Sequence, residues 1–365
     1  MTEKMLPLLR PSLPRAELLL PYLQQIDQNA IYTNFGPLNQ SLIARLTSLQ
    51  RDCFGRQVFG ITTSSATLAL ELMLADLNLP PASRILLPSL TFVATATAIL
   101  RAGHIPVVAD VDPESWLLTP SSLSTNISLQ TISAVIPVAT FGMPQCAESW
   151  ASWSEQTGIP VIIDAAGAFG AQKTSNNVPV IFSLHATKCL STGEGGLIFT
   201  EDPEQAANLI NLTNFGLGGA TTGGGTNAKM SEYHAAVGHA ELDAWPQNKI
   251  RRLSLFNNYR SILTSKFGDG LGYQKDTGLT APNMFLVRFN SHQERLKAEK
   301  ACANNGILTR RWYQPLIQNH PSLMRVESPQ PTPHANKLAD RLLGLPFYLD
   351  LTKEDIHRIS KALNL

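Results

Sequence analysis

The chain has 365 residues, of which 44% are hydrophobic, and this length suffices for a large core domain plus a smaller one, because single cores stop growing at about 250–300 residues. Its 29 basic and 28 acidic residues leave a formal net charge of +1, so no overall field attracts nucleic acid or an anionic membrane. No apolar stretch reaches the length of about 18 residues that spans a bilayer, and the four scattered cysteines suit neither a disulfide framework nor a zinc site. We therefore expect a cytoplasmic protein that acts on small molecules, without a metal, a nucleic acid or a membrane as its partner.

The first half of the chain alternates between helical and extended segments. Periodicity and turn residues predict, in chain order, helices over 15–28 and 38–53, a strand over 58–62, a helix over 67–77, a strand over 84–88, a helix over 94–102, strands over 106–109 and 134–138, a helix near 149–156 and a strand over 160–164. Runs rich in Val and Ile between helices are typical of a largely parallel sheet that helices cover on both faces. The sequence therefore predicts an α/β fold.

The second half of the chain indicates a change of architecture. It is predicted to contain helices over 202–215, 232–260 and 355–363, strands over 284–289 and 306–309, and a glycine-rich mobile surface loop over 216–225. The long helix that begins near residue 232 connects the two regions. We therefore expect a large domain over residues 1–245 and a smaller α+β domain over residues 246–365.

Asp164 is the first candidate for chemistry, because it ends a predicted strand and precedes the small residues of segment 165–171. The carboxyl ends of parallel strands are where α/β sheets place their ligands. In an enzyme that uses pyridoxal phosphate, such a carboxylate pairs with the pyridinium nitrogen and keeps the ring protonated, so that the ring can accept electron density. The alternative is an Asp that only caps the following helix.

Lys188 is the second candidate, since it lies between an apolar run and a glycine-rich turn within segment 183–196. Lysine is seldom buried without a reason, and burial lowers the pKa of its amine, which suits it to Schiff-base formation and proton transfer. Ser183, five residues earlier, could bind a phosphate oxygen. A solvated charge before a turn is the alternative for Lys188.

Small residues at a strand-to-helix junction, segment 63–70, form the third candidate. Backbone N–H groups that converge at a helix N-terminus bind anions, and a cofactor phosphate is a natural occupant. An ordinary helix cap is an equally good interpretation. Phe92, at the next such junction, could stack on a flat ring, although a lone Phe is more often part of a core.

Together these segments resemble the DegT/DnrJ/EryC1/StrS family of sugar aminotransferases along nearly the whole chain. The matching segments are 65–70 with 88–95, 103–112, 164–170, 183–196, 225–232, 345–347 and 351–355. Their order and spacing agree with the family. The resemblance implies the fold-type I architecture of aspartate aminotransferase, with a mostly parallel seven-stranded sheet between helices and a smaller C-terminal α+β domain.

The resemblance also implies pyridoxal 5'-phosphate as the cofactor. Lys188 would carry it as a Schiff base, and Asp164 would pair with the ring nitrogen. The contacts to the ring face and to the phosphate would come from Phe92, Ala66, Thr67 and Ser183. Asn227 of the partner subunit would reach the same phosphate, because family members are homodimers with shared active sites.

Two positions depart from the family pattern. Ala66 stands where many members have Gly, which disfavours a positive φ but leaves its N–H available. Gly167 stands where members commonly have Gln or His, which touches the cofactor or covers its ring, so this chain has no side chain for that role. Some dehydratases of the family replace the lysine by histidine, and Lys188 argues against their chemistry.

By analogy with the family, the expected reaction moves an amino group from L-glutamate to a nucleotide-linked (dTDP-, UDP- or GDP-) keto-deoxysugar. Candidate contacts for a diphosphate and a flat base are Arg310, Arg311, Trp312 and Tyr313, since guanidinium groups pair with phosphates; a surface strand of mixed charge is the alternative. His185, near Lys188 in the sequence, is a further candidate, with a packed histidine as the alternative. Other functions left open are transfer to a non-nucleotide ketone, such as a cyclitol or an antibiotic precursor, and a regulatory protein that binds the cofactor without turnover. The sequence identifies neither the nucleotide nor the carbon that is aminated.

Overall fold

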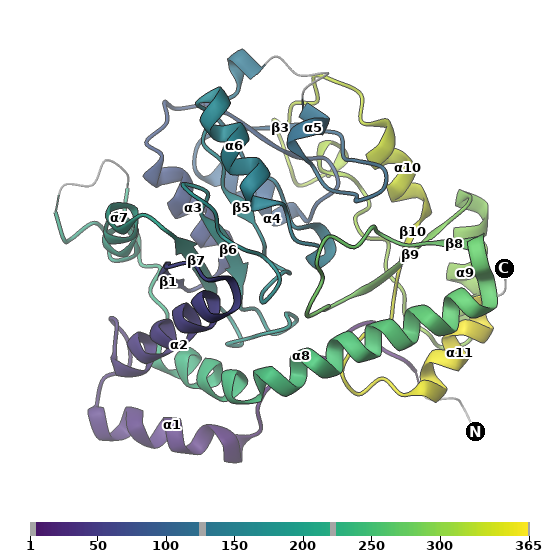
Figure 1. Ribbon diagram of the computed structural model, residues 1–365, viewed down its shortest axis with the longest axis horizontal. Coiled ribbons are helices and arrows are strands. Elements are labelled where there is room, and N and C mark those ends of the chain that lie inside the picture. Colours follow the sequence, from purple (N-terminus) through teal and green to yellow (C-terminus); the bar gives the residue numbers. More distant parts are fainter. Residues whose placement is uncertain (1–4, 124–128, 220–223, 364–365) are drawn as a thin grey trace.

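The computed structural model describes residues 5–123, 129–219 and 224–363. A large α/β part is followed by a smaller part at the C-terminal end (Figure 1). The helices of the first part are α1 (Ala16–Asn29), α2 (Pro37–Phe54), α3 (Ala66–Asp76), α4 (Val93–Arg101), α5 (Pro120–Leu123), α6 (Ala147–Thr157) and α7 (Pro203–Thr213). Its strands are β1 (Phe59–Thr63), β2 (Arg84–Pro88), β3 (Ile105–Ala109), β4 (Ala134–Val135), β5 (Ile163–Asp164), β6 (Val180–Ser183) and β7 (Gly196–Thr200).

The strands of this part form two sheets. One has the order β1-β7-β6-β5, in which β5 and β6 are parallel and β7 is antiparallel to both of its neighbours. The other has the order β3-β2-β4 and is parallel throughout. Isolated parallel bridges, Val135 to Val161 and Val138 to Asp164, connect the two sheets. The predicted α/β fold is confirmed, whereas the single seven-stranded sheet is not resolved.

Apolar side chains alternate between the two faces of these strands. In β6, Val180 and Phe182 belong to one buried cluster and Ile181 to another. Helices α2, α6 and α8 (Glu232–Phe267) pack on the first cluster, and α3, α4 and α7 on the second. Because strand side chains alternate with a period of two, a sheet with a core on each face requires the continuous apolar runs seen in the sequence.

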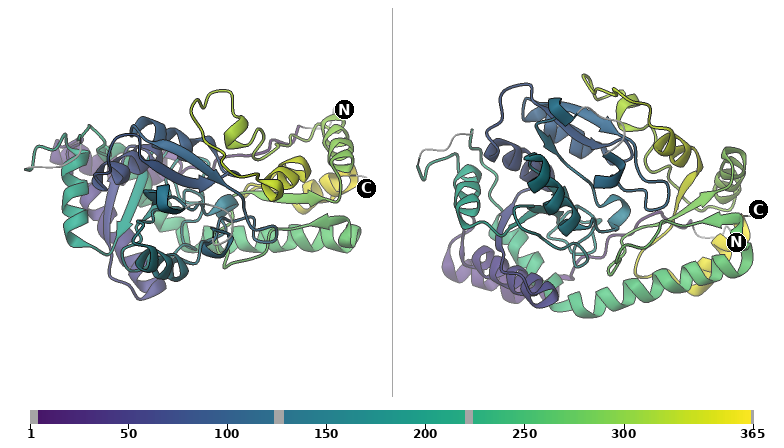
Figure 2. Two further views of the ribbon diagram at one scale, coloured as in Figure 1. Left: turned by 90° about the horizontal axis from the view of Figure 1, so that it is seen from above. Right: turned by 45° about the horizontal axis from the view of Figure 1, so that its top comes forward.

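The C-terminal part is built on a long helix, α8 (Glu232–Phe267), which runs from the large part to the far end of the molecule (Figures 1 and 2). Its antiparallel sheet has the order β10-β9-β8, with β8 (Leu271–Gly272), β9 (Phe285–Phe289) and β10 (Leu342–Leu345). Helices α9 (His292–Asn304), α10 (Pro333–Arg341) and α11 (Lys353–Leu363) complete it. Although α8 has 36 residues, neither it nor another helix among the described residues is apolar over a length that could cross a membrane.

Several predicted elements differ from the structure. No strand covers 306–309, where only isolated bridges from Ile307 to Leu6 and from Arg310 to Gly344 occur. Strands β6, β7, β8 and β10 and helices α5, α9 and α10 were not predicted. The predicted boundary at residue 246 falls inside α8, which is continuous there, and the division into two domains stays a prediction. Of the predicted mobile loop, residues 220–223 lie outside the described residues.

Candidate active site

One cavity of about 390 Å³ lies at the carboxyl ends of β5 and β6, beside the N-terminus of α3. Because Asp164 is the last residue of β5 and Ser183 the last of β6, and the two strands are parallel, both side chains reach the same edge of the sheet. The loop between β6 and β7 carries Lys188 into this cavity. The predicted cofactor residues that line it are Ala66, Thr67, Phe92, Asp164, Ser183 and Lys188.

Asp164 is a buried carboxylate, with 4% of its surface exposed. Burial raises its pKa above the ordinary range, against the opposing effects of a Thr95 hydroxyl, the Ala166 N–H and Lys188. The Thr95 hydroxyl donates to Oδ2 at 2.7 Å, and the Ala166 N–H donates to Oδ1 at 3.1 Å. These two bonds fix the orientation of the carboxylate. A cationic partner in the cavity would favour its charged form.

Lys188 lines the same cavity as Asp164 and can carry the opposite charge. Burial lowers the pKa of its amine, while Asp164 and Cys189 act to raise it. Its own backbone N–H donates to the carbonyl of His185 at 2.9 Å, which closes a turn that presents the side chain. A buried amine with a lowered pKa is more readily neutral, and neutral amines are nucleophiles and bases.

The N-terminus of α3 forms one end of the cavity. The Ser65 hydroxyl caps this helix by accepting the Leu68 N–H at 3.2 Å. Ala66 is the first residue of α3, so the position needs no positive φ and its departure from Gly carries no backbone cost. Gly196 of β7 lets the turn approach the sheet, because a Cβ there would lie 2.6 Å from the Ser65 carbonyl oxygen. The exposed amides of a helix N-terminus favour a phosphate.

Aromatic rings form one wall of the cavity. Phe92 is half-exposed, and its ring centroid lies 5.9 Å from that of Tyr313. Tyr313 in turn stacks on Phe141, with centroids 5.3 Å apart and an interplanar angle of 17°. Burial raises the pKa of the Tyr313 hydroxyl, and Asp164 adds to this, which places the phenol close to the carboxylate. The cavity can therefore hold a flat ring against an aromatic face.

Comparison with known proteins assigns the chain to a family. The DegT/DnrJ/EryC1/StrS aminotransferase family matches residues 15–364. The chain belongs to this family. Its sequence is 30% identical over 375 residues to the dTDP-4-amino-4,6-dideoxy-D-glucose transaminase of Escherichia coli, a match that covers 100% of the chain and 99% of the relative.

Solved structures agree with this membership of the aminotransferase family. A Bacillus cereus protein described as a candidate PLP-dependent aminotransferase superimposes with a TM-score of 0.90 at 28% identity, covering 99% of this chain and 100% of the other. DesI, solved in the presence of its TDP-sugar product, superimposes with a TM-score of 0.87 at 29% identity, covering 99% and 92%. These matches confirm the fold of a pyridoxal-phosphate aminotransferase.

The described residues fit pyridoxal 5'-phosphate, the cofactor of this aminotransferase family. Its phosphate suits the capped N-terminus of α3, where Ala66 and Thr67 line the cavity. Its basic ring nitrogen suits the buried carboxylate of Asp164, whose pKa is raised by burial and lowered in part by the nearby Lys188. Its aldehyde suits the amine of Lys188. Each of the three reactive groups of the cofactor thus has a chemically matched partner in one cavity.

The predicted substrate residues separate into two sets. His185, Arg310 and Tyr313 line the cavity, and His185 Nδ1 lies 2.9 Å from the Thr187 hydroxyl. Arg311 does not line it, because its guanidinium pairs with Glu299 at 2.9 Å on the surface.

Asn227 also lies outside the lining of the cavity. It is exposed and forms an isolated bridge with Asn214, while the carbonyl of Ala228 accepts the Ser64 N–H at 2.8 Å. This backbone bond holds the segment beside the turn that precedes α3. Asn227 is therefore the chain neighbour of a residue that is bonded to the turn before α3, but it does not line the cavity of its own subunit.

Sequence reasoning missed several residues of the cavity. Thr95 orients Asp164 from 69 positions away, and Met284 comes from the C-terminal part. Thr95 belongs to the segment that carried the family resemblance, so a polar residue one turn after Phe92 was a usable signal. The contact of Met284 depends on how the C-terminal part folds back, and no local pattern predicts that. Trp312, a predicted substrate contact, also lines the cavity.

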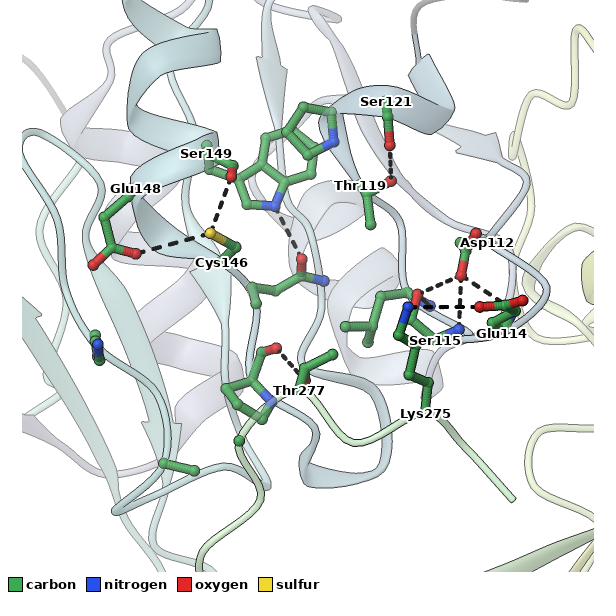
Figure 3. A pocket seen from close by; sticks show the side chains of 18 of the residues that line it. Asp112, Glu114, Ser115, Thr119, Ser121, Cys146, Glu148, Ser149, Lys275 and Thr277 are labelled. Carbon is green, nitrogen blue, oxygen red and sulfur yellow. Dashed lines mark hydrogen bonds and ion pairs between the residues drawn. The ribbon is translucent and has the colours of Figure 1, made fainter. Parts of the chain in front are cut away.

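A larger cavity, of about 840 Å³, lies elsewhere, and Figure 3 shows its polar residues. These groups mostly bind one another: the Ser115 N–H donates to Asp112 Oδ1 at 2.7 Å, Lys275 pairs with Glu114 at 3.6 Å, and the Ser149 hydroxyl lies 3.0 Å from Cys146 Sγ. None of the predicted site residues lines it. Cavity size alone therefore does not locate the chemistry of this aminotransferase.

Glu241 of α8 lies beneath the loop that carries Lys188. Its side chain is 6% exposed, and its carboxylate accepts the backbone N–H of Ser191. Burial raises its pKa to about 7, against the opposing effects of Arg252 and the Ser191 N–H. Arg252 donates to the carbonyl of Pro282 at 3.4 Å. A carboxylate with this pKa changes charge near neutral pH while it contacts the active-site loop.

Replacing Glu241 by Gln is predicted to change how stability depends on pH. The folded state holds a proton on Glu241 between the unfolded pKa of 4.5 and the folded pKa of about 7, so the wild type loses stability as pH rises through this window. The loss is about 3 kcal/mol, at 1.36 kcal/mol per pKa unit, and Glu241→Gln should lack it. Urea denaturation at pH 5 and pH 7.5 measures this, with exposed Glu155→Gln as the matched control. Parallel stability profiles for the wild type and Glu241→Gln would contradict the assignment.

Proposed function

We propose that this aminotransferase moves an amino group from L-glutamate to the carbonyl carbon of a dTDP-linked keto-deoxysugar. The observation that carries the proposal is a single cavity that combines the amine of Lys188, the carboxylate of Asp164 and the N-terminus of α3. Full-length similarity to a dTDP-amino-sugar transaminase supports the acceptor, as does the similarity to DesI with its TDP-sugar product.

Lys188 has two tasks in this reaction. Bound pyridoxal phosphate supplies an electron sink that stabilises negative charge on the carbon that loses its proton. The Nζ atom of Lys188, whose pKa burial lowers, takes the proton from the α-carbon of glutamate. In the second half-reaction the same Nζ atom delivers a proton to the sugar carbon that receives the amino group.

Asp164 holds charge at the opposite end of the cavity. Its carboxylate, oriented by the Thr95 hydroxyl and the Ala166 N–H, would keep a proton on the ring nitrogen. A buried acid alone has a raised pKa, so the cationic ring and the carboxylate stabilise each other's charged forms.

The substrate's diphosphate would meet Arg310 at the cavity wall. Arg310 lies with its guanidinium carbon 5.9 Å from the centroid of the Trp312 ring, and both line the cavity. Arg311 is engaged with Glu299, which favours Arg310 for this role. His185 and Tyr313, on the same lining, are the neighbours proposed for the sugar.

The active unit is proposed to be a homodimer in which Asn227 of the partner subunit completes the phosphate site. In support, half-exposed aromatic residues flank Asn227 in the chain: Phe215 donates its N–H to the carbonyl of Thr226 at 3.1 Å, and Tyr233, six residues after Asn227, stacks on Tyr32 with centroids 6.3 Å apart. Exposed aromatic clusters commonly mark interfaces.

Asp164→Asn is predicted to spare folding and to slow both half-reactions on the order of 100-fold, as expected for loss of a preorganised charge. Stopped-flow absorbance with glutamate measures the first half-reaction. Asp202→Asn is the matched control, because Asp202 caps α7 on the surface and Asn caps equally well. A rate for Asp164→Asn equal to that of the control would show that another acid serves the ring nitrogen.

The acceptor is tested by product analysis. With pyridoxal phosphate and glutamate, the protein should convert dTDP-4-keto-6-deoxyglucose to its 4-amino derivative with release of 2-oxoglutarate, and Lys188→Ala should give none. Mass spectrometry measures the amine products formed from the dTDP-linked sugar, from UDP- and GDP-linked keto-sugars and from a cyclitol ketone in separate reactions. If the cyclitol ketone gave an amine and no nucleotide sugar did, the proposed nucleotide-sugar acceptor would be wrong and a non-nucleotide ketone would be the substrate.

Shared active sites predict complementation between inactive subunits. If Asn227 acts across the interface, a hybrid of a Lys188→Ala subunit and an Asn227→Ala subunit contains one site with both residues intact. Random reassociation of the two variants should restore roughly a quarter of the wild-type activity. No recovery in hybrids confirmed by native mass spectrometry would mean that Asn227 serves its own subunit or no site.

A further inference from the structure

Segment 310–313 of the C-terminal part carries three residues of the cavity lining, Arg310, Trp312 and Tyr313. Arg310 pairs with Gly344 of β10: its N–H donates to the Gly344 carbonyl at 3.1 Å, and its carbonyl accepts the Gly344 N–H at 2.7 Å. Successive side chains of an extended segment point to opposite sides. This accounts for the position of Arg310 on the lining and of its neighbour Arg311 outside it.

Arg311 is bound to helix α9 by a two-pronged ion pair. Its Nε atom donates to Oε1 and Oε2 of Glu299 at 2.9 and 3.0 Å, and its Nη2 atom donates to Oε2 at 2.9 Å. An isolated single contact between exposed charges adds little stability, whereas a bidentate guanidinium–carboxylate pair also fixes the relative geometry of its partners. The pair therefore sets the position of Arg311 against α9.

Glu299 is in turn held from the interior of the C-terminal part. Arg295, one turn earlier on α9, has a fully buried side chain whose Nη1 atom donates to Glu299 Oε2 at 2.7 Å. The Nε atom of Arg295 donates to the carbonyl of Asp340 in α10, also at 2.7 Å. A buried guanidinium needs such partners, because an unpaired charge in the interior is costly. The Glu299 carboxylate therefore connects a rigid interior charge to the segment that lines the cavity.

The two neighbouring arginines differ in what they bind. The charge of Arg311 is matched by Glu299, whereas Arg310 forms no ion pair with a carboxylate within the described part of the chain and lies over the Trp312 ring at 5.9 Å. Arg310 thus keeps its donors for an anion in the cavity. Because Arg310 and Arg311 are adjacent in the chain, a contact that fixes Arg311 also limits where the Arg310 guanidinium can lie.

We propose that Glu299 is a positioning residue for the nucleotide sugar: by binding Arg311 it fixes segment 310–313, so that Arg310 meets the diphosphate and Tyr313 the sugar. This inference rests on the substrate contacts given under the proposed function. Glu299 does not line the cavity, so it acts through Arg311. The keto-sugar half-reaction depends on this contact, and the glutamate half-reaction, in which Lys188 acts from the large part, does not.

Kinetics of Arg311→Met, Glu299→Gln and the double variant test the positioning role in the holoenzyme. Each single variant should raise KM for dTDP-4-keto-6-deoxyglucose about fivefold with kcat nearly unchanged, the effect of losing about 1 kcal/mol of binding. The double variant should be no worse than either single one, because both changes remove the same pair. The glutamate half-reaction, followed by stopped-flow absorbance, should keep its wild-type rate. Arg101→Met is the matched control, since it removes a surface ion pair with Glu71 at 2.7 Å away from the cavity lining.

A direct contact of Arg311 with the substrate would give a different pattern. Glu299→Gln would then free Arg311 and leave KM unchanged or lower it, while Arg311→Met raised it. That pattern, an unchanged KM in both single variants, or an equal slowing of the glutamate half-reaction would overturn the proposal. Thermal unfolding shows whether Glu299→Gln folds, since it leaves the buried Arg295 without its carboxylate. If it does not fold, Arg295→Met combined with Glu299→Gln removes the buried charge as well and takes its place in the comparison.

Binding of dTDP separates a failure of this inference from a failure of the proposed function. Isothermal titration of the wild-type holoenzyme should detect dTDP, and Arg311→Met should weaken it by the same factor as it raises KM. A wild type that neither bound dTDP nor aminated any nucleotide sugar would refute the proposed acceptor and this inference with it. A wild type that did both, with dTDP bound equally well by Arg311→Met, would refute the positioning role alone.

Discussion

The candidate active site depends on one electrostatic arrangement: an acid and an amine are buried in the same cavity, and the pKa of each is shifted away from its ordinary value. Burial raises the pKa of Asp164 and lowers that of Lys188, and each partly offsets the shift of the other. Neither group is therefore held firmly in its charged form by the protein alone. A cofactor with a cationic ring nitrogen would stabilise the charged carboxylate of Asp164. Its carbonyl carbon would react with the amine of Lys188.

The sheet makes this arrangement possible. Parallel β5 and β6 end at Asp164 and Ser183, and antiparallel β7 brings Gly196 next to Ser183. The missing side chain at Gly196 lets the turn at Ser65 lie against the strands, which sets the N-terminus of α3 over the same edge. Cores on both faces of the strands keep these positions rigid, so that the charges are placed before any ligand binds.

Residues with strong local signals could be predicted from the sequence. Asp164 ends an apolar run and Lys188 precedes a glycine-rich turn, and both line the cavity as expected. The contact between Thr95 and Asp164 joins positions 69 residues apart, so no local pattern assigns it, although Thr95 lies in a segment that carried the family resemblance. Arg311 was predicted as a substrate contact for the same reason: its ion pair with Glu299 of α9 depends on the fold, and no local pattern indicates it. Strands β6 and β7 were missed because they flank the motif of Lys188 and lack alternation, being buried throughout.

The central claim is that Lys188, and no other lysine, attaches the cofactor. Reduction of the protein with borohydride in the presence of pyridoxal phosphate fixes a cofactor–lysine linkage, and peptide mass spectrometry then locates it. The account predicts one modified peptide, spanning Lys188, with stoichiometric labelling that excess glutamate suppresses. Labelling at Lys229 or at any other lysine with Lys188 unmodified, or no labelling at all, would contradict it.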